Sequence, residues 1–525
     1  MTSIPPSPTA TQGHPPLDPG PGSPGERPVL LLDRLRPHRL LSGTVLLGLA
    51  GSVLLATMAV GAGGILVTDP LVTGGPLSWI RYGHGRDLAT AALYLGVGMI
   101  VWAWVRLGRD VLAGQVTAQR VQVAGAVWMA PMLLSPPLFT RDVYSYLGQG
   151  ALALHGLDPY QVGPSALPPG PTADNVHYAW QTTPAPYGPL FIAIAKTVNW
   201  LTGEDAIAGV IGMRLVLLAG LGLLVFALPR LADQLGGNRT VTLWLVVANP
   251  MTVVHLVGGP HNDLLMIGLL AAGTLLVLRR WHVAGIALVT VAMAVKAPAG
   301  VALPFLVWIW ASRLPGSREA QLLRAGAASL AVFTTVFTAV TMLSGVGLGW
   351  IPALNAPSVI VNWMSLPTAA GELVHAVTSP VHDVSSGQFI KVCRWLGSGV
   401  FLVIVAWQWW LARDGSGPEA VRRAAIALLW SALLAPATLP WYLTWALVLA
   451  AVLPWRRRSL ALAVAGSTWL VLATYPTGEA AFNSWSYQIG VTAVSLIAAT
   501  ALLRRDPLQV HGRTQRTASG PTGTA

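Results

Sequence analysis

The residues best suited to chemistry lie in a long polar stretch between two apolar segments, Thr140 to Asp205. Arg141 and Asp142 open it, directly after an apolar segment that ends near Leu138. A carboxylate at the face of a membrane can deprotonate a hydroxyl group, and partial removal from water raises its basicity. Asp142 is therefore a candidate general base. The alternatives are that it caps the next helix or pairs with Arg141.

A second polar group lies in a short turn, Gly258 to Asp263, between two apolar segments. His261, Asn262 and Asp263 supply an imidazole, an amide and a carboxylate, which are suited to binding sugar hydroxyls or, through His261, a phosphate. Asn and Asp are also ordinary turn and N-cap residues, so a purely structural role stays open. His261 and Asp263 are too few for a metal site, and no paired histidines or cysteines support one. We therefore expect no cofactor and no metal site built from these residues, while assistance by a divalent cation stays an open alternative.

Two cations stand within or beside apolar segments. Lys296 lies at the end of one, and Arg214 lies inside the segment that begins near Ala206. A buried cation needs an anionic partner, and a lipid phosphate is a natural one at a membrane interface. The alternative is that both side chains extend along the apolar surface toward lipid headgroups.

The composition predicts an integral membrane protein. The 525 residues are 54% hydrophobic and 10% charged, whereas soluble domains carry roughly 25% charge. Apolar runs near the ~20 residues that cross a bilayer indicate an all-α polytopic bundle. The net charge of +12 comes mostly from short clusters between apolar runs, which excludes a nucleic-acid partner and leaves membrane lipids. Cys393 is the only cysteine, so no internal disulfide forms.

Three regions follow from the distribution of apolar residues. Residues 1–28 and 506–525 are rich in polar and small residues, and we expect disordered cytoplasmic tails. Residues 29–505 form one multi-span membrane domain. Its expected transmembrane or re-entrant helices number about 14, near 40–67, 88–106, 121–138, 206–229, 241–257, 264–278, 282–297, 299–312, 325–349, 390–411, 424–439, 441–454, 459–475 and 487–503.

The basic residues predict the topology. Alternate connections between these segments hold 24 of the 32 Lys and Arg residues, and cytoplasmic loops are enriched in these residues. Both termini are therefore expected in the cytoplasm of a multi-pass plasma-membrane protein. The stretch from Thr140, the Gly258 turn, the Lys296 turn and the loops near 350–389 and 476–487 are then expected on the outer side.

Two segments need separate treatment. Residues 281–312 are too long for one span and too short for two, yet arginines flank both ends. We expect two short or re-entrant helices that meet near Lys296, because broken backbone at membrane depth must be buried in protein or line a wet cavity. Residues 190–201 are apolar but short, and we expect an amphipathic helix along the membrane surface.

Tryptophans are abundant, at 22. We interpret those expected on the outer side mainly as a membrane-interface belt: Trp180, Trp350, Trp363, Trp441 and Trp485.

Several short motifs together resemble the actinobacterial polyprenyl-phosphomannose-dependent α-1,6-mannosyltransferases (Mpt type) of the glycosyltransferase C superfamily. The resemblance covers about 40–503 and rests on Arg141-Asp142-Val143-Tyr144-Ser145-Tyr146, Gly156-Leu157-Asp158-Pro159-Tyr160, Pro184-Ala185-Pro186-Tyr187-Gly188-Pro189, Asn249-Pro250, Gly258-Gly259-Pro260-His261-Asn262-Asp263 and Lys296-Ala297-Pro298. It implies a glycosyltransferase C-like bundle with a long first extracytoplasmic catalytic loop.

The resemblance also implies a reaction and its partners. Such enzymes take mannose from a polyprenyl-phosphate donor and add it, with inversion, to a lipid-linked α-1,6-mannan of the lipomannan type. The superfamily's functional acid would correspond to Asp142, although a strict Asp-x-Asp motif is absent. Lys296 and Arg214 would hold the phosphate. The residues expected to bind sugar are Arg141, Tyr144, Tyr187, His261, Asn262 and Asp263.

The competing hypothesis is a multi-span lipid or glycan transporter or flippase. Broken helices and intramembrane cations are common in transporters, and Lys296 and Arg214 would then line a path. Transporters usually place substrate groups near the membrane midplane between two related halves, whereas here the polar groups gather on one predicted face. The sequence therefore favours an enzyme.

Overall fold

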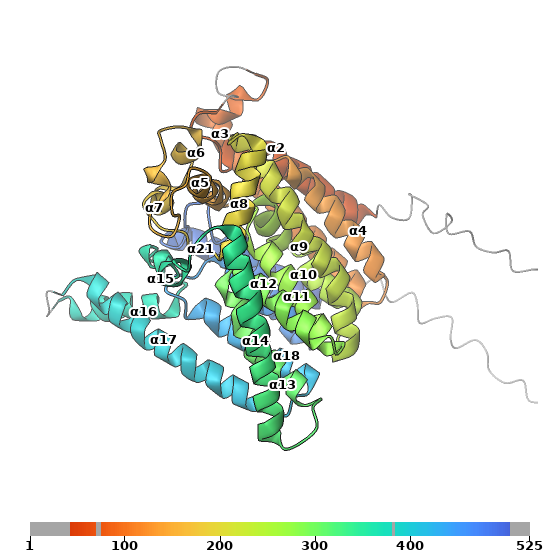
Figure 1. Ribbon diagram of the computed structural model, residues 1–525. Coiled ribbons are helices and arrows are strands. Elements are labelled where there is room, and N and C mark those ends of the chain that lie inside the picture. Colours follow the sequence, from red (N-terminus) through yellow and green to blue (C-terminus); the bar gives the residue numbers. More distant parts are fainter. Residues whose placement is uncertain (1–41, 70–74, 381–383, 505–525) are drawn as a thin grey trace, which may run out of the picture. The chain divides into compact units, whose positions relative to one another are not determined.

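The structure is a computed structural model that describes residues 42–69, 75–380 and 384–504. These residues are helical almost throughout (Figure 1). Within these ranges, β pairing is limited to one isolated bridge, between Thr474 and Ala480. The predicted all-α fold is confirmed. The predicted disordered tails, 1–28 and 506–525, lie outside the described residues.

The helices of the first part of the chain are α2 (Gly43–Ala62), η2 (Ser78–Arg81), α3 (Gly83–Leu112), α4 (Ala118–Met129), η3 (Ala130–Leu133), α5 (Asp142–Leu154), η4 (Pro164–Ala166), α6 (Pro171–Asp174), α7 (Tyr178–Gln181), α8 (Pro189–Thr202), α9 (Ala206–Leu235), α10 (Arg239–Val246), η5 (Met251–Gly258) and α11 (Asp263–Leu278). Those that follow are α12 (His282–Val295), η6 (Ala297–Ala302), α13 (Leu303–Ala311), α14 (Arg318–Ser344), α15 (Trp350–Ala353), η7 (Ala356–Val359), α16 (Leu366–Thr378), α17 (Ser386–Leu411), α18 (Gly417–Leu433), η8 (Pro440–Tyr442), α19 (Leu443–Ala450), α20 (Arg457–Val471) and α21 (Trp485–Leu503).

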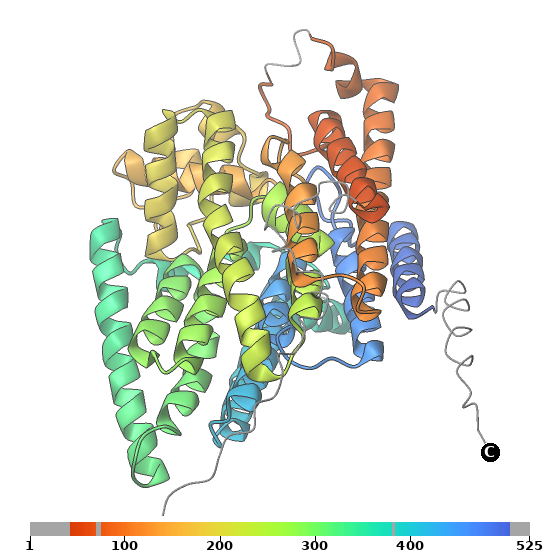
Figure 2. The same cartoon turned by 90° about the vertical axis from the view of Figure 1, so that its right-hand side faces the viewer.

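Several helices are long and apolar enough to cross a membrane. Six qualify in the described part of the chain: α2, α3, α9, α14, α17 and α21. The pair α10 and η5, bent by 50°, would make a seventh, and four shorter apolar helices accompany them. Every predicted span overlaps one of the observed helices, but the count of fourteen stays a prediction. Figure 2 shows α14 on the opposite side of the bundle from α2 and α3.

The centre of the bundle is α11, which is apolar on every side and buried along nearly its whole length. A helix of this kind must be surrounded by other helices. Small residues allow the close approach, because a Cβ atom at Gly268 would lie 2.3 Å from the Gly220 carbonyl oxygen of α9. On the other side, a Cβ atom at Gly285 of α12 would lie 2.7 Å from the Gly273 carbonyl oxygen. These contacts fix Asp263, the first residue of α11.

The chain before α11 is broken at the Asn249-Pro250 motif. Pro250 has no N–H to continue α10, and the chain re-enters as η5, a π-helix. The Asn249 side chain replaces the lost pairing: its amide donates to the Leu245 carbonyl oxygen at 2.8 Å and to Ser467 Oγ at 3.0 Å, and its oxygen accepts from the Met251 N–H at 2.9 Å. The break therefore keeps its hydrogen bonds inside the protein.

Arg214 of α9 serves the other end of η5. Its guanidinium donates to the carbonyl oxygens of Val257 (3.2 Å), Gly258 (2.7 Å), Leu133 (3.1 Å) and Ser135 (2.5 Å). A helix end leaves carbonyl groups without partners. One buried cation thus joins the end of η5 to the segment after η3.

A second break lies at Lys296, as predicted. α12 ends at Val295, Lys296 has extended backbone angles (φ −153°, ψ 127°), and η6 follows. Pro298 cannot donate the next helical hydrogen bond. At the end of α12, the Val295 carbonyl oxygen accepts from the N–H of Gly188 at 3.2 Å. The two short helices are confirmed, and the Tyr187-Gly188 motif is docked beside Lys296.

The segment 190–201 is also helical, as α8, and it packs against α5 and α9. Figure 1 shows α5, α6 and α7 grouped at one end of the bundle, beside α8. The helix is confirmed, whereas its expected orientation along the membrane surface stays a prediction.

Replacing Arg214 tests this account of the helix break. We expect Arg214→Leu to destabilise the fold by about 2–3 kcal/mol, because several buried carbonyl oxygens lose their donor. The measurement is the apparent Tm of the purified protein in detergent. Arg230→Leu is the matched control, since Arg230 lies on the same helix and its guanidinium makes an exposed hydrogen bond to the Phe226 carbonyl oxygen one turn away. Equal Tm values for both variants would contradict the account.

Candidate active site

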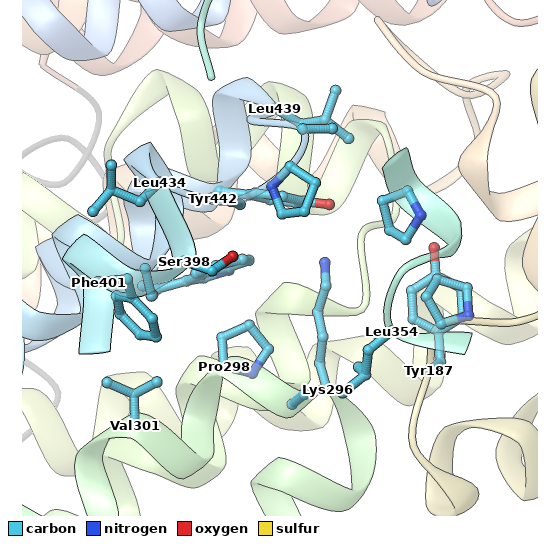
Figure 3. Close-up of a pocket in the computed structure, with 18 of the residues that line it drawn as sticks. Tyr187, Lys296, Pro298, Val301, Leu354, Ser398, Phe401, Leu434, Leu439 and Tyr442 are labelled. Carbon is cyan, nitrogen blue, oxygen red and sulfur yellow. The ribbon is translucent and has the colours of Figure 1, made fainter. Parts of the chain in front are cut away.

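One cavity of about 340 Å³ brings the predicted polar segments together. Figure 3 shows Lys296 extending into it between Tyr187 and Tyr442, with Phe401 and Val301 farther along. The polar part is lined by Asp142, Trp180, Tyr187, Lys296, Tyr442 and Trp445, and the apolar part by residues such as Val301, Leu354, Pro357, Phe401, Leu434 and Leu439. Asp142 and Lys296, 154 positions apart in the sequence, thus face one space.

Asp142 is the first residue of α5 and its carboxylate faces the cavity with 13% of the side chain exposed. Its Oδ1 accepts a hydrogen bond from Trp180 Nε1 at 3.3 Å, and its Oδ2 lies 3.6 Å from His261 Nδ1. The backbone N–H of Asp142 is bonded by Thr140 Oγ1 at 3.0 Å. Asp142 itself does not cap the helix, since the N-cap residue is Arg141, whose side chain makes no capping hydrogen bond.

The alternative pairing of Asp142 with Arg141 is not what the structure shows. The Arg141 guanidinium donates to the carbonyl oxygens of Ile65 (2.8 Å) and Asn175 (2.9 Å). The neighbours of the Asp142 carboxylate are therefore Trp180 and His261.

The surroundings make Asp142 a stronger base. Burial raises the pKa of its carboxyl group to about 6, against the smaller lowering effects of the Lys296 charge and the Trp180 hydrogen bond. A base with a pKa near the working pH is deprotonated and still accepts a proton readily.

His261 lies behind Asp142 and is fully buried. Its ring stacks on Trp441, with ring centres 3.7 Å apart, and its Nδ1 lies 3.3 Å from Tyr146 Oη. It is not among the residues that line the cavity. The geometry therefore gives His261 a supporting position against the carboxylate, in place of the expected direct contact with sugar.

Asn262 is buried beside His261. Its side-chain amide has no hydrogen-bond partner among the described residues. Buried polar groups without partners are rare and mark sites with an additional polar ligand or water.

Lys296 is held by Asp263. Its Nζ donates to both carboxylate oxygens, at 2.9 and 2.8 Å, and Asp263 also accepts from Trp445 Nε1 at 2.5 Å. The Tyr442 and Trp445 rings lie 4.7 and 5.5 Å from Nζ. Because an ammonium group has three N–H donors, one remains for a ligand in the cavity. Asp263 thus positions Lys296 and does not line the cavity.

Three of the predicted site residues lie elsewhere. The guanidinium groups of Arg214 and Arg141 donate to backbone carbonyl oxygens, as described above. Tyr144 donates from its hydroxyl to the Gly64 carbonyl oxygen at 2.7 Å and stacks under Arg141. None of the three lines the cavity. We therefore assign the three residues a structural role. Arg141 and Tyr144 hydrogen-bond the residues after α2, and Arg214 hydrogen-bonds the end of η5.

Four aromatic residues belong to the site although the sequence did not single them out for it: Trp180, Trp441, Tyr442 and Trp445. Trp180 and Trp441 were interpreted as part of the interface belt. The sequence alone does not distinguish a tryptophan that hydrogen-bonds a carboxylate from one that lies at a membrane surface. In the structure, Leu439-Pro440-Trp441-Tyr442 contains η8, which lies beside the cavity.

Metal ligands are not clustered in the described ranges, where no group of three His, Cys, Asp or Glu side chains could hold an ion. The charged groups of the cavity are Asp142 and the pair of Lys296 with Asp263. The arrangement places a base at one end of a polar chamber and a held cation at its side.

Two family models match the chain. The model described as "Alpha-(1->6)-mannopyranosyltransferase, N-terminal domain" matches residues 45–312, and "MptB C-terminal domain" matches residues 367–504. No solved structure matches the chain significantly.

Relatives cover most of the chain. Alpha-(1->6)-mannopyranosyltransferase A of Mycobacterium tuberculosis is 43% identical over 88% of this chain and 90% of its own length. The protein of the same name from Corynebacterium glutamicum is 33% identical over 70% and 79%. A probable alpha-(1->6)-mannopyranosyltransferase of Mycolicibacterium smegmatis is 35% identical over 77% and 78%. These names favour mannosyl transfer over transport, and the chain belongs to the α-(1→6)-mannopyranosyltransferase family of glycosyltransferases.

Proposed function

We propose that this chain transfers mannose from a polyprenyl-phosphate-linked donor to a lipid-linked α-1,6-mannan acceptor, with inversion at the anomeric carbon. The observation that carries the proposal is the cavity itself, in which a base and a cation share a polar end that continues into an apolar end. A sugar phosphate suits the polar end. The apolar end, which includes Phe401 of α17 and Leu434 beside α18, suits a polyprenyl chain.

The reaction needs a base for the acceptor and a partner for the leaving phosphate. Asp142 takes the proton of the acceptor hydroxyl as that oxygen forms a bond to the anomeric carbon of the donor. The bond from this carbon to the phosphate oxygen breaks, and polyprenyl phosphate leaves with the electron pair. The free N–H of Lys296 stabilises the negative charge that develops on the phosphate.

The paired carboxylate of Asp263 has a defined part in this scheme. It keeps the Lys296 ammonium charged in an apolar setting and aims it at the cavity, because two of its three N–H groups are committed. Tyr187 lies over the ammonium, 6.0 Å from ring centre to Nζ, and is placed to contact the mannose.

We further propose that the cavity lies on the extracytoplasmic side of the plasma membrane and that both termini are cytoplasmic. The support is the charge pattern of the connections together with the lining residues. Asp142, Trp180, Lys296 and Leu354 come from connections that this pattern assigns to one side. Three separately predicted outer segments therefore meet in one place.

Replacing the base tests the proposed chemistry. We expect Asp142→Asn to lower kcat by about a hundredfold or more, because the amide cannot accept the proton. The assay uses purified protein in lipid with polyprenyl-phosphomannose and a short α-1,6-mannoside. Asp174→Asn, an exposed carboxylate of the same loop, should keep wild-type turnover. Near wild-type activity of Asp142→Asn would show that the base is another group.

The pH dependence follows from the raised pKa of Asp142. The base works deprotonated, so kcat/KM should be half-maximal near pH 6, approach its full value about one pH unit higher and fall about tenfold per pH unit at lower pH. The measurement is the rate at limiting donor from pH 4.5 to 8. An acidic limb centred near pH 4 would mean that the catalytic carboxylate is exposed to water.

Lys296 should matter more for the donor than for the acceptor. We expect Lys296→Met to raise the donor KM roughly tenfold or more, the loss of one charged hydrogen bond to phosphate, with a smaller effect on the acceptor KM. Lys196→Met, on α8 and outside the cavity lining, is the control. A larger effect on the acceptor would refute the assignment.

A further inference from the structure

A hairpin from the C-terminal part of the chain contacts the backbone just before Asp142. We call it the 474–480 hairpin, after its isolated bridge between Thr474 and Ala480. The N–H of Phe139 donates to the Pro476 carbonyl oxygen at 3.0 Å, and Thr474 Oγ1 donates to the Phe139 carbonyl oxygen at 3.3 Å. Both polar backbone groups of Phe139 are thus bonded to the hairpin.

Phe139 adopts a backbone conformation that a bulky residue rarely takes. Its φ angle is +58°, and its side chain is fully buried against Tyr94 and His255. Such a conformation is strained and persists only where the surroundings impose it, often at functional sites. Here the strained residue turns the chain into α5, three positions before the base.

The hairpin lies directly on the next residues of the same segment. Gly478 has φ +98°, and a Cβ atom there would be 3.0 Å from Thr140 Cα and 3.2 Å from the Arg141 nitrogen. Only glycine permits this approach without a shift. The contact covers the backbone that begins α5.

The hairpin also reaches the hydrogen-bond donor of Asp142 by a second route. Glu479 Oε1 lies 3.2 Å from His177 Nε2, and His177 Nδ1 accepts from the N–H of Ala179 at 3.3 Å. Because Nδ1 is an acceptor, the neutral ring carries its proton on Nε2 and donates it to Glu479. His177 thereby caps α7, the one-turn helix that carries Trp180, whose indole donates to Asp142.

We propose that the 474–480 hairpin is a positioning device for the active site, and that Glu479, through His177, holds the Trp180 indole on the Asp142 carboxylate. The inference rests on the proposed role of Asp142 as base. It assigns a function to Glu479, Thr474 and Gly478, none of which lines the cavity. Two segments far apart in the sequence, residues 139–142 and 474–480, thus determine the position of Asp142.

The pH profile provides a readout that a purely structural contact would not move. A hydrogen bond to a carboxylate stabilises its charged form and lowers its pKa, so loss of the Trp180 contact raises the pKa of Asp142. The other charged or titratable groups that face Asp142 include Lys296, Asp263, His177, His261 and the three tyrosines Tyr146, Tyr187 and Tyr442. Glu479→Ala leaves all of them in place.

The experiment compares full-length variants in the lipid assay described above. Glu479→Ala, half-exposed in the wild type, should move the acidic limb of kcat/KM upward by about half a pH unit to one unit, as Trp180→Phe does. Glu479→Gln keeps an acceptor oxygen for His177 and should restore the wild-type limb. The double variant Glu479→Ala/Trp180→Phe should show no larger shift than Trp180→Phe alone.

A second His–Glu pair supplies the matched control. His155 Nε2 and Glu204 Oε1 lie 2.9 Å apart in the same outer region and away from the cavity. His155→Ala should leave the limb unchanged, whereas His177→Ala should shift it.

The outcomes separate the two proposals. An unshifted limb in Glu479→Ala overturns the positioning role, and so does an equal shift in Glu479→Gln, which would show an effect of charge alone. If Asp142→Asn itself retained turnover, the assignment of the base would fail instead.

Discussion

The ion pair between Lys296 and Asp263 is the contact on which the rest of the site depends. Two charges removed from water in an apolar bundle are costly unless they are paired closely and the remaining donors and acceptors are satisfied. Here Asp263 takes two N–H groups of Lys296 and one of Trp445, and aromatic rings cover the ammonium. The pair also joins the start of α11 to the end of α12. Removing either partner would leave the other charge buried alone, so the two helix ends must stay together.

This constraint explains why the polar residues of the candidate site lie at interrupted helices. A continuous helix satisfies its own backbone and presents only side chains, whereas an interrupted helix directs its terminal groups and its first residue into the protein interior. Asn249, Arg214 and the N–H of Gly188 bond the backbone groups that the interruptions expose. The interior can therefore hold an irregular, polar region beside α11 without losing hydrogen bonds.

Much of the architecture follows from local sequence rules, and much of the site does not. Apolar run lengths located the helices, and the flanking arginines with Pro298 predicted the break at Lys296. Asp142 and Lys296 were identified because isolated charges are conspicuous in an apolar chain. Arg214 and Arg141 are equally conspicuous in the sequence, yet they bond backbone carbonyl oxygens outside the cavity lining. Only the tertiary structure shows which carbonyl groups lack a partner. Trp180 and Trp445 were missed because their hydrogen bonds join segments 38 and 182 positions apart.

The two regions of the chain that match family models combine to build the candidate site. Asp142, His261 and Lys296 come from the part matched by the N-terminal family model. Trp441, Tyr442, Trp445 and the 474–480 hairpin come from the part matched by the C-terminal one. Neither part has the complete environment of Asp142. The strained φ angle of Phe139 is imposed across this division, since both of its backbone bonds go to the hairpin. The geometry of Asp142 is therefore a property of the assembled bundle. Sequence changes in either part must preserve these contacts if that geometry is to be kept.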